Sequence, residues 1–194
     1  MQRFMNNLAR GMAMLGGLVL TFLIVLTCLS VLGRTLNTIL HSNFAETILG
    51  GLTKTLLDTG VGPISGDFEL VEAGIAFSIF AFIPWCQITG GHASVDIFTS
   101  ALPVRVNRFI LMIGEILFAL TLILISWKLY DGTMSKMRYG ETTFLLQFPI
   151  WWAYAISLVG SVVSAIVTVY MAVVRSAEFF RNETIVQVSG GADH

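Results

Sequence analysis

Long apolar runs, separated by shorter polar connections, dominate this sequence. Four of them cover about residues 11–33, 73–90, 109–127 and 148–174. A helix needs about 20 predominantly apolar residues to cross a hydrocarbon layer of about 30 Å, and runs of this length match that requirement. Strands of a membrane barrel would be shorter and would alternate apolar with polar positions. The pattern predicts an all-α membrane protein with four transmembrane helices.

The connection between the first two runs has a different periodicity. Over residues 35–57, apolar side chains recur at helical spacing, with polar and charged side chains between them. This pattern is typical of an amphipathic helix that lies in the membrane interface, and we expect one here. A fifth crossing is the alternative, but it would have to bury the charges of Glu46 and Lys54.

Composition indicates that little of the chain lies outside the membrane. The 194 residues are 55% hydrophobic and 12% charged, about half the charged fraction of soluble domains. We expect a single membrane domain over residues 1–180 and a polar, disordered tail over residues 181–194. With 11 Lys and Arg against 12 Asp and Glu, the charge balance offers no basic surface for nucleic acid.

Four crossings place both termini on one side of the membrane, together with the connection between the second and third runs. The basic residues of the short connections favour the cytoplasm for that side. The side opposite the termini would then carry Trp and Tyr residues near both ends of the last connection, which is typical of an interfacial aromatic belt.

Glu115 is the acidic residue inside the third apolar run. A charged group at membrane depth is costly, so it is the first candidate for function. It could be a proton or cation site, or it could pair with Arg105, with Arg108 or with a partner subunit. We favour pairing because an ion site needs more converging oxygen ligands than one carboxylate supplies.

Three further groups are candidates for holding helices in register or for contacting a partner. Glu69 and Glu72 are three residues apart at the start of the second run, hence on one helix face near the positive end of its dipole. His92 and Asp96 have the i, i+4 spacing of a metal pair, but two ligands do not make a site. Arg34 closes the first run as an interface anchor.

Motifs for catalysis are absent from the sequence. It contains no P-loop, no G-x-S-x-G, no H-E-x-x-H and no histidine within an apolar run, and a haem anchor of the cytochrome b type needs such histidines. We expect no catalytic, cofactor or metal site in this chain.

Several short motifs occur in a recognisable order along the chain. They are E-L-V-E at 69–72, G-H-A-S-V-D at 91–96, L-P and Arg105 after it, G-E-T-T at 140–143 and F-P-I-W at 148–151. In this order on a four-span chain they resemble the small membrane subunit (DctQ-like) of tripartite ATP-independent periplasmic (TRAP) transporters. The resemblance covers about residues 14–175, and the long connection after Arg34 departs from the family's usual form.

The resemblance implies a transporter of the bacterial inner membrane with three components. A periplasmic substrate-binding protein delivers an organic anion, commonly a carboxylate, to a large permease subunit that uses a sodium gradient. The small subunit would be a fixed scaffold for the large one, with no substrate site of its own. Its candidate subunit-contact or helix-register residues are Arg34, Glu69, Glu72, His92, Asp96, Arg105, Glu115 and Glu141.

Two other classes of protein fit a short multi-span chain. The first is a self-sufficient exporter or exchanger that works as a homo-oligomer around Glu115. The second is the membrane anchor of a redox complex. Transport by the purified chain in liposomes would favour the first, and a haem absorbance spectrum would favour the second.

Overall fold

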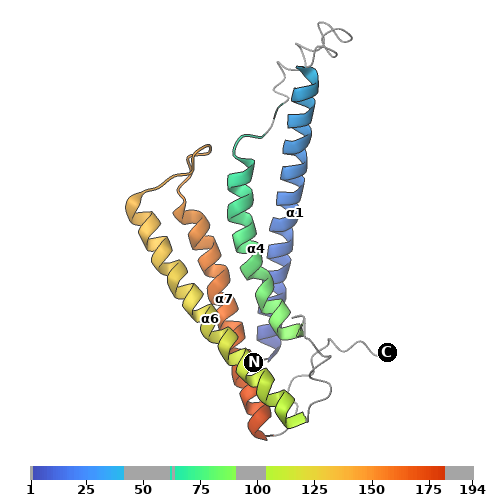
Figure 1. Ribbon diagram of the computed structural model, residues 1–194, viewed down its shortest axis with the longest axis vertical. Coiled ribbons are helices and arrows are strands. Elements are labelled where there is room, and N and C mark those ends of the chain that lie inside the picture. Colours follow the sequence, from blue (N-terminus) through green and yellow to red (C-terminus); the bar gives the residue numbers. More distant parts are fainter. Residues whose placement is uncertain (1, 42–61, 63, 91–103, 182–194) are drawn as a thin grey trace, which may run out of the picture.

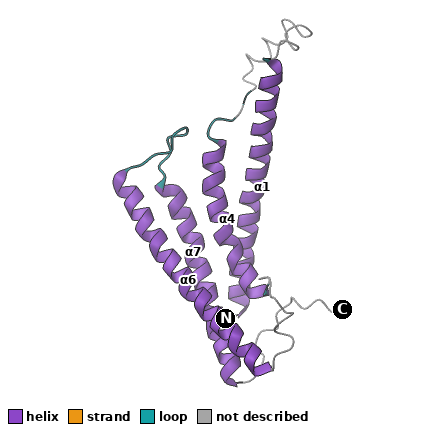
Figure 2. Cartoon of the chain, in the orientation of Figure 1, coloured by secondary structure: helices purple, strands orange, loops and turns teal. Residues whose placement is uncertain are grey.

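The computed structural model describes residues 2–41, 62, 64–90 and 104–181, and its regular structure is helical (Figures 1 and 2). The helices are α1 (Gln2–Leu40), α4 (Asp67–Thr89), α6 (Val104–Tyr139) and α7 (Trp151–Arg181). Four helices in the described residues are long and apolar enough to cross a membrane. The predicted all-α, four-span fold is therefore confirmed.

Each of the four helices extends beyond the apolar run that predicted it at one end or at both. Helix α1 starts at Gln2 and α6 continues to Tyr139, so both helices continue beyond the predicted spans, which cover residues 11–33 and 109–127. Charged side chains in the interface can reach water while the backbone keeps its helical hydrogen bonds, so a helix does not have to end where its apolar run ends.

The predicted interfacial helix is not confirmed. Residues 35–40 continue α1, and residues 42–57 lie outside the described residues. The predicted tail lies outside them as well, apart from Arg181, which is the last residue of α7.

The helices pack in the order α1, α4, α7, α6, with each of the inner two between two neighbours. Figure 1 shows the α1–α4 pair and the α6–α7 pair spreading apart toward the end that carries the turn between α6 and α7. We call this end the loop end. Half of the most apolar stretch of α7 is buried, against 11% of that of α6. The arrangement is an open layer with α7 near its centre, and it leaves large apolar surfaces uncovered.

Small residues allow α1 and α4 to approach closely. A Cβ atom placed on Gly16 of α1 would lie 2.8 Å from the Cβ of Ala81, and one placed on Gly74 of α4 would lie 2.6 Å from Leu23. The Ser78 hydroxyl donates to the Gly16 carbonyl at 3.4 Å. Small side chains and interhelical hydrogen bonds are the usual means of joining helices in a membrane, where apolar contact with lipid is equally favourable.

A proline determines how α4 joins α7. Pro84 lies inside α4 and has no N–H, so the carbonyl of Phe80, four residues earlier, loses its helical donor. The Ser164 hydroxyl of α7 lies 2.6 Å from this carbonyl and donates to it. Gly160, one turn before Ser164, brings the two backbones together, since a Cβ there would lie 3.0 Å from the Cβ of Phe80. The carbonyl freed by proline is therefore satisfied across the helix interface.

Helices α6 and α7 are joined along most of their length. The hydroxyls of Ser126 and Ser161 are 3.0 Å apart near the middle. Toward the loop end, Tyr154 packs over Gly132, and at the opposite end the rings of Phe109 and Phe179 lie 5.7 Å apart.

Candidate functional site

Residues 141–150, which connect α6 to α7, form a tight hydrogen-bonded turn that we call the 141–150 loop. The Thr143 N–H donates to the Phe148 carbonyl at 2.9 Å, and the Ile150 N–H donates to the Glu141 carbonyl at 3.0 Å. The Phe148 N–H reaches the Thr143 hydroxyl at 3.3 Å. Gly140 and Gln147 have positive φ angles of 62° and 52°, which reverse the chain on either side of the loop tip. The G-E-T-T and F-P-I-W motifs are thus the two arms of one ordered loop.

Glu69 fixes this loop to α4. One oxygen of its carboxylate accepts the Leu145 N–H at 2.7 Å, and the other accepts the Leu146 N–H at 3.0 Å. The side chain is buried, with the residue 8% exposed. Hydrogen bonds to a charged acceptor are among the stronger ones in proteins, and here they satisfy two loop donors that no strand pairs. The contact joins the beginning of α4 to a loop 76 residues later.

The beginning of α4 is shaped to receive the loop. Gly66 precedes the helix with φ 79°, and a Cβ placed on it would overlap the Leu146 side chain. On the other side, Ser30 of α1 accepts the Ile64 N–H at 3.3 Å and interacts with the Asp67 carboxylate. Helix α1 and the 141–150 loop therefore both contact the chain where α4 begins.

The tip of the 141–150 loop is apolar and faces outward. Phe144 is 90% exposed, and Leu145 and Leu146 are also exposed. An ordered loop that holds large apolar side chains away from the core is typical of a contact surface for a partner or for lipid.

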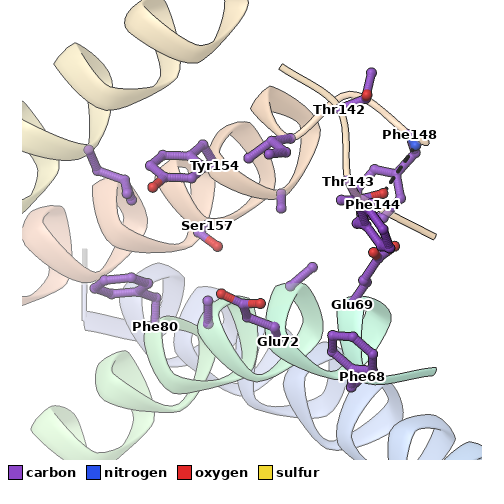
Figure 3. A pocket seen from close by; sticks show the side chains of 15 residues that line it. Phe68, Glu69, Glu72, Phe80, Thr142, Thr143, Phe144, Phe148, Tyr154 and Ser157 are labelled. Atoms are coloured by element: carbon purple, nitrogen blue, oxygen red, sulfur yellow. Dashed lines mark hydrogen bonds between the residues drawn. The ribbon is translucent and has the colours of Figure 1, made fainter. Parts of the chain in front are cut away.

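A cavity of about 490 Å³ lies beneath the loop, between α4 and α7. Its walls are mostly apolar, and Glu72 of α4 and Ser157 of α7 supply polar groups from facing sides (Figure 3). The Ser157 hydroxyl is buried and has no hydrogen-bond partner among the described residues. Glu72 is exposed, and no described side chain pairs with it.

A second polar cluster lies toward the opposite end of the helices. Gln87 of α4 is hydrogen-bonded to Glu115 of α6, and Arg175 of α7 acts on Glu115 electrostatically. Arg175 forms a largely buried ion pair with Glu178 at 2.7 Å. Polar groups from three helices meet here, so the intramembrane charge of Glu115 is placed among partners from its own chain.

The remaining predicted site residues are scattered. Arg34 is exposed on α1 and acts on Asp67, Glu141 pairs with Lys136, and Arg105 is exposed at the start of α6. His92 and Asp96 lie outside the described residues. Among the residues that the structure does describe, no three His, Cys, Asp or Glu side chains are grouped so that they could hold a metal ion.

Sequence reasoning missed several residues that contribute to these contacts. Ser164 and Ser157 are small polar residues among many on α7, and Arg175, which acts on Glu115, directly follows the fourth apolar run. The proline at 84 was the one available signal, since it implied a carbonyl in need of a donor. The identity of that donor depends on how two helices cross.

Comparison with known proteins gives one match. A family model described as "Tripartite ATP-independent periplasmic transporters, DctQ component" matches residues 23–178, which include all four helices in whole or in part. No curated protein and no solved structure matches the chain.

Proposed function

This chain belongs to the DctQ family of TRAP transporter components, and we propose that within such a transporter it is the fixed membrane scaffold of the large permease subunit. The large subunit carries the substrate site and uses the sodium gradient. The substrate is an organic anion, most simply a carboxylate, which a periplasmic binding protein delivers. The small chain performs no catalysis and has no complete substrate site. The match gives no support to an independent exporter or a redox anchor.

The observation that carries this proposal is how the polar groups inside the helices are used. Ser78 and Ser164 each form a hydrogen bond to a neighbouring helix, and Gln87 of α4 forms one to Glu115 of α6. A translocation path needs polar groups that face the solute, whereas these hold four helices in one arrangement. These interhelical hydrogen bonds favour a rigid scaffold over a subunit that moves during transport.

The open layer of helices leaves apolar surface on which a second membrane-embedded subunit can bind. Helices α1 and α6 form the two edges of the layer, and most of their large apolar side chains are exposed. Lipid can cover such a surface, but so can the helices of a larger subunit. We propose that one face of the layer binds the permease and that the other faces lipid.

Orientation follows from the same proposal. The protein lies in the bacterial inner membrane with both termini in the cytoplasm, so the loop end faces the periplasm. Exposed aromatic residues near this end, such as Trp127, Tyr139 and Trp152, suit the membrane interface. The apolar tip of the 141–150 loop is then in a position to approach the binding protein.

The candidate residues divide into two roles under this proposal. Glu69 and Glu115, which have partners on other elements of the chain, keep the helices in register. Arg34 and Arg105 are exposed and are the candidates for subunit contact. Alanine at the first pair should weaken the subunit itself, whereas alanine at the second group should weaken the complex.

Co-expression with the large permease subunit of the same transporter tests the proposal. We expect the two membrane chains to purify together from detergent. Proteoliposomes that contain both, with binding protein and an inward sodium gradient, should accumulate the carboxylate, and proteoliposomes with this chain alone should not. Transport by the chain alone, or purification of the lone subunit under conditions where the permease is intact, would contradict it.

A further inference from the structure

The cavity beneath the 141–150 loop has the form of a binding site. Its volume is about 490 Å³, and α4, α7 and the loop all contribute to its wall. Along α4 it extends from Phe68 to Phe80, a distance of about 18 Å at 1.5 Å per residue. The hydrogen bonds of Glu69 to the loop keep its roof in place, so the space exists before any ligand arrives.

Two polar groups in the cavity lack partners in the described part of the chain. The Ser157 hydroxyl lies in the wall of α7 without a hydrogen bond, although the residue is only 3% exposed. Buried hydroxyls in native proteins nearly always have a partner. The Glu72 carboxylate lies across from it on α4 (Figure 3). Both groups are therefore available to a ligand.

The chemistry of the cavity selects the ligand. Aromatic and aliphatic side chains, including Phe80, Phe148 and Ile150, form most of the wall and suit an alkyl chain. A carboxylate accepts hydrogen bonds and donates none, so it requires a ligand with N–H or O–H groups and favours a positive charge. We propose that this cavity binds a phospholipid with a primary ammonium headgroup, with one acyl chain between α4 and α7 and the ammonium at Glu72.

The membrane location makes a lipid the natural source of this chemistry. The cavity lies between two helices that are long and apolar enough to span the bilayer, and its carboxylate is near the start of α4, where headgroups lie. A lipid held there would fill the space between the diverging helix pairs. It would add to the rigidity of the loop end, independently of whether a permease is bound.

Native mass spectrometry of the full-length chain tests the proposal. The protein is incubated with vesicles of equal amounts of phosphatidylethanolamine and phosphatidylcholine with identical acyl chains, then transferred to detergent. Choline has no N–H to donate. We expect one retained lipid with a preference of about tenfold for ethanolamine, the effect of one charge-assisted hydrogen bond. Glu72→Gln should reduce this preference to near unity.

Two variants that fill the cavity test its location. Ala76→Phe and Ala153→Phe place a ring in it from opposite walls, and both should abolish the retained lipid. Ile79→Phe is the matched control, because Ile79 is exposed on α4 outside the cavity, and it should retain the lipid. Circular dichroism shows which variants are folded. One folded variant with a filled cavity is enough for the test.

The outcomes that would overturn the proposal are distinct. They are equal retention of the two phospholipids by the wild type, undiminished retention in a folded variant with a filled cavity, and loss of the lipid when the large subunit binds. The last would mean that the permease, and not a lipid, occupies the cavity.

Discussion

The carboxylate of Glu69 lies 2.7 Å from the backbone nitrogen of Leu145 and accepts its N–H. This bond connects the first turn of α4 with the turn between α6 and α7, which are far apart in sequence. It makes the position of the loop tip depend on a single buried side chain. Because the acceptor is a side chain and the donors are backbone groups, substitutions within the loop leave the contact possible, whereas a substitution of Glu69 removes it.

Replacing Glu69 should therefore release the loop. Glu69→Gln exchanges one acceptor oxygen for an NH₂ group that cannot accept the hydrogen bond of a loop N–H. We expect a lower unfolding temperature in detergent and faster chymotryptic cleavage at the exposed Phe144. Glu72→Gln, on the same helix face but without a described partner, is the control and should change neither. Equal cleavage rates for the two variants would mean that the loop is held by its own hydrogen bonds.

Ser164 and Pro84 should be coupled in stability. Ser164→Ala leaves the Phe80 carbonyl without a donor and should cost about 1 kcal/mol, as typical hydrogen bonds between membrane helices do. In a Pro84→Ala background the residue at 84 again has an N–H for this carbonyl, so the same serine substitution should cost less. A double-mutant cycle by unfolding in mixed micelles measures the difference. Additive effects would show that the Ser164 hydroxyl serves mainly its second neighbour, the Gly160 carbonyl.

Adjacent glycines of α1 should respond in opposite ways to alanine. Gly16→Ala places a methyl group 2.8 Å from the Cβ of Ala81, so α1 and α4 must separate, at a cost of about 1–3 kcal/mol. Gly17 has nothing within 4 Å of such a group, and Gly17→Ala should be neutral or slightly stabilising because alanine favours helix. Thermal unfolding of the two variants gives the comparison. A loss of similar size in both would place the effect in the helix itself.

The ion pair of Arg175 and Glu178 should tolerate loss of both charges better than loss of one. Arg175→Met leaves the largely buried Glu178 carboxylate without its guanidinium, and also removes the positive charge near Glu115. The cost should be about 3 kcal/mol or more. Adding Glu178→Gln to this variant should recover part of the stability, measured by chemical unfolding. If Glu178→Gln recovers no stability, the loss in Arg175→Met comes from Glu115, which has lost the nearby positive charge.

Phe144 should matter for transport and not for folding. The side chain is 90% exposed, so Phe144→Ser removes little packing. If the loop tip approaches the binding protein, the reconstituted complex should need a higher concentration of binding protein for half-maximal uptake, with unchanged unfolding temperature. Leu117→Ser, an exposed apolar position within α6, is the comparison. An unchanged requirement for binding protein would assign the loop tip to lipid or to the permease.

The four helices could be predicted because each leaves a long apolar run in the sequence. Their ends could not, since residues such as Arg10 and Lys136 continue a helix into the interface without changing its backbone hydrogen bonds. The order of packing could not be predicted either. It depends on where Gly16, Gly74 and Gly160 meet a neighbour, and a glycine that contacts a neighbour cannot be told from Gly17 or Gly114 by sequence.

The contacts of the candidate site could not be predicted from the sequence. Glu69 and Glu115 were singled out from the sequence as acids in unusual places, and both have partners on other elements of the chain. Glu69 bonds to backbone N–H groups, which leave no trace in a sequence. Glu115 meets Gln87 and Arg175, which come from two other helices.

The bond between the Ser164 hydroxyl and the Phe80 carbonyl has an evolutionary consequence. A homologue that replaced Pro84 with an ordinary helix former would recover its own donor at that turn and would be free to lose the hydroxyl at 164. Conversely, a chain that keeps the proline is under selection to keep a donor on the facing helix. Positions 84 and 164 should therefore change together among natural relatives, although 80 residues separate them.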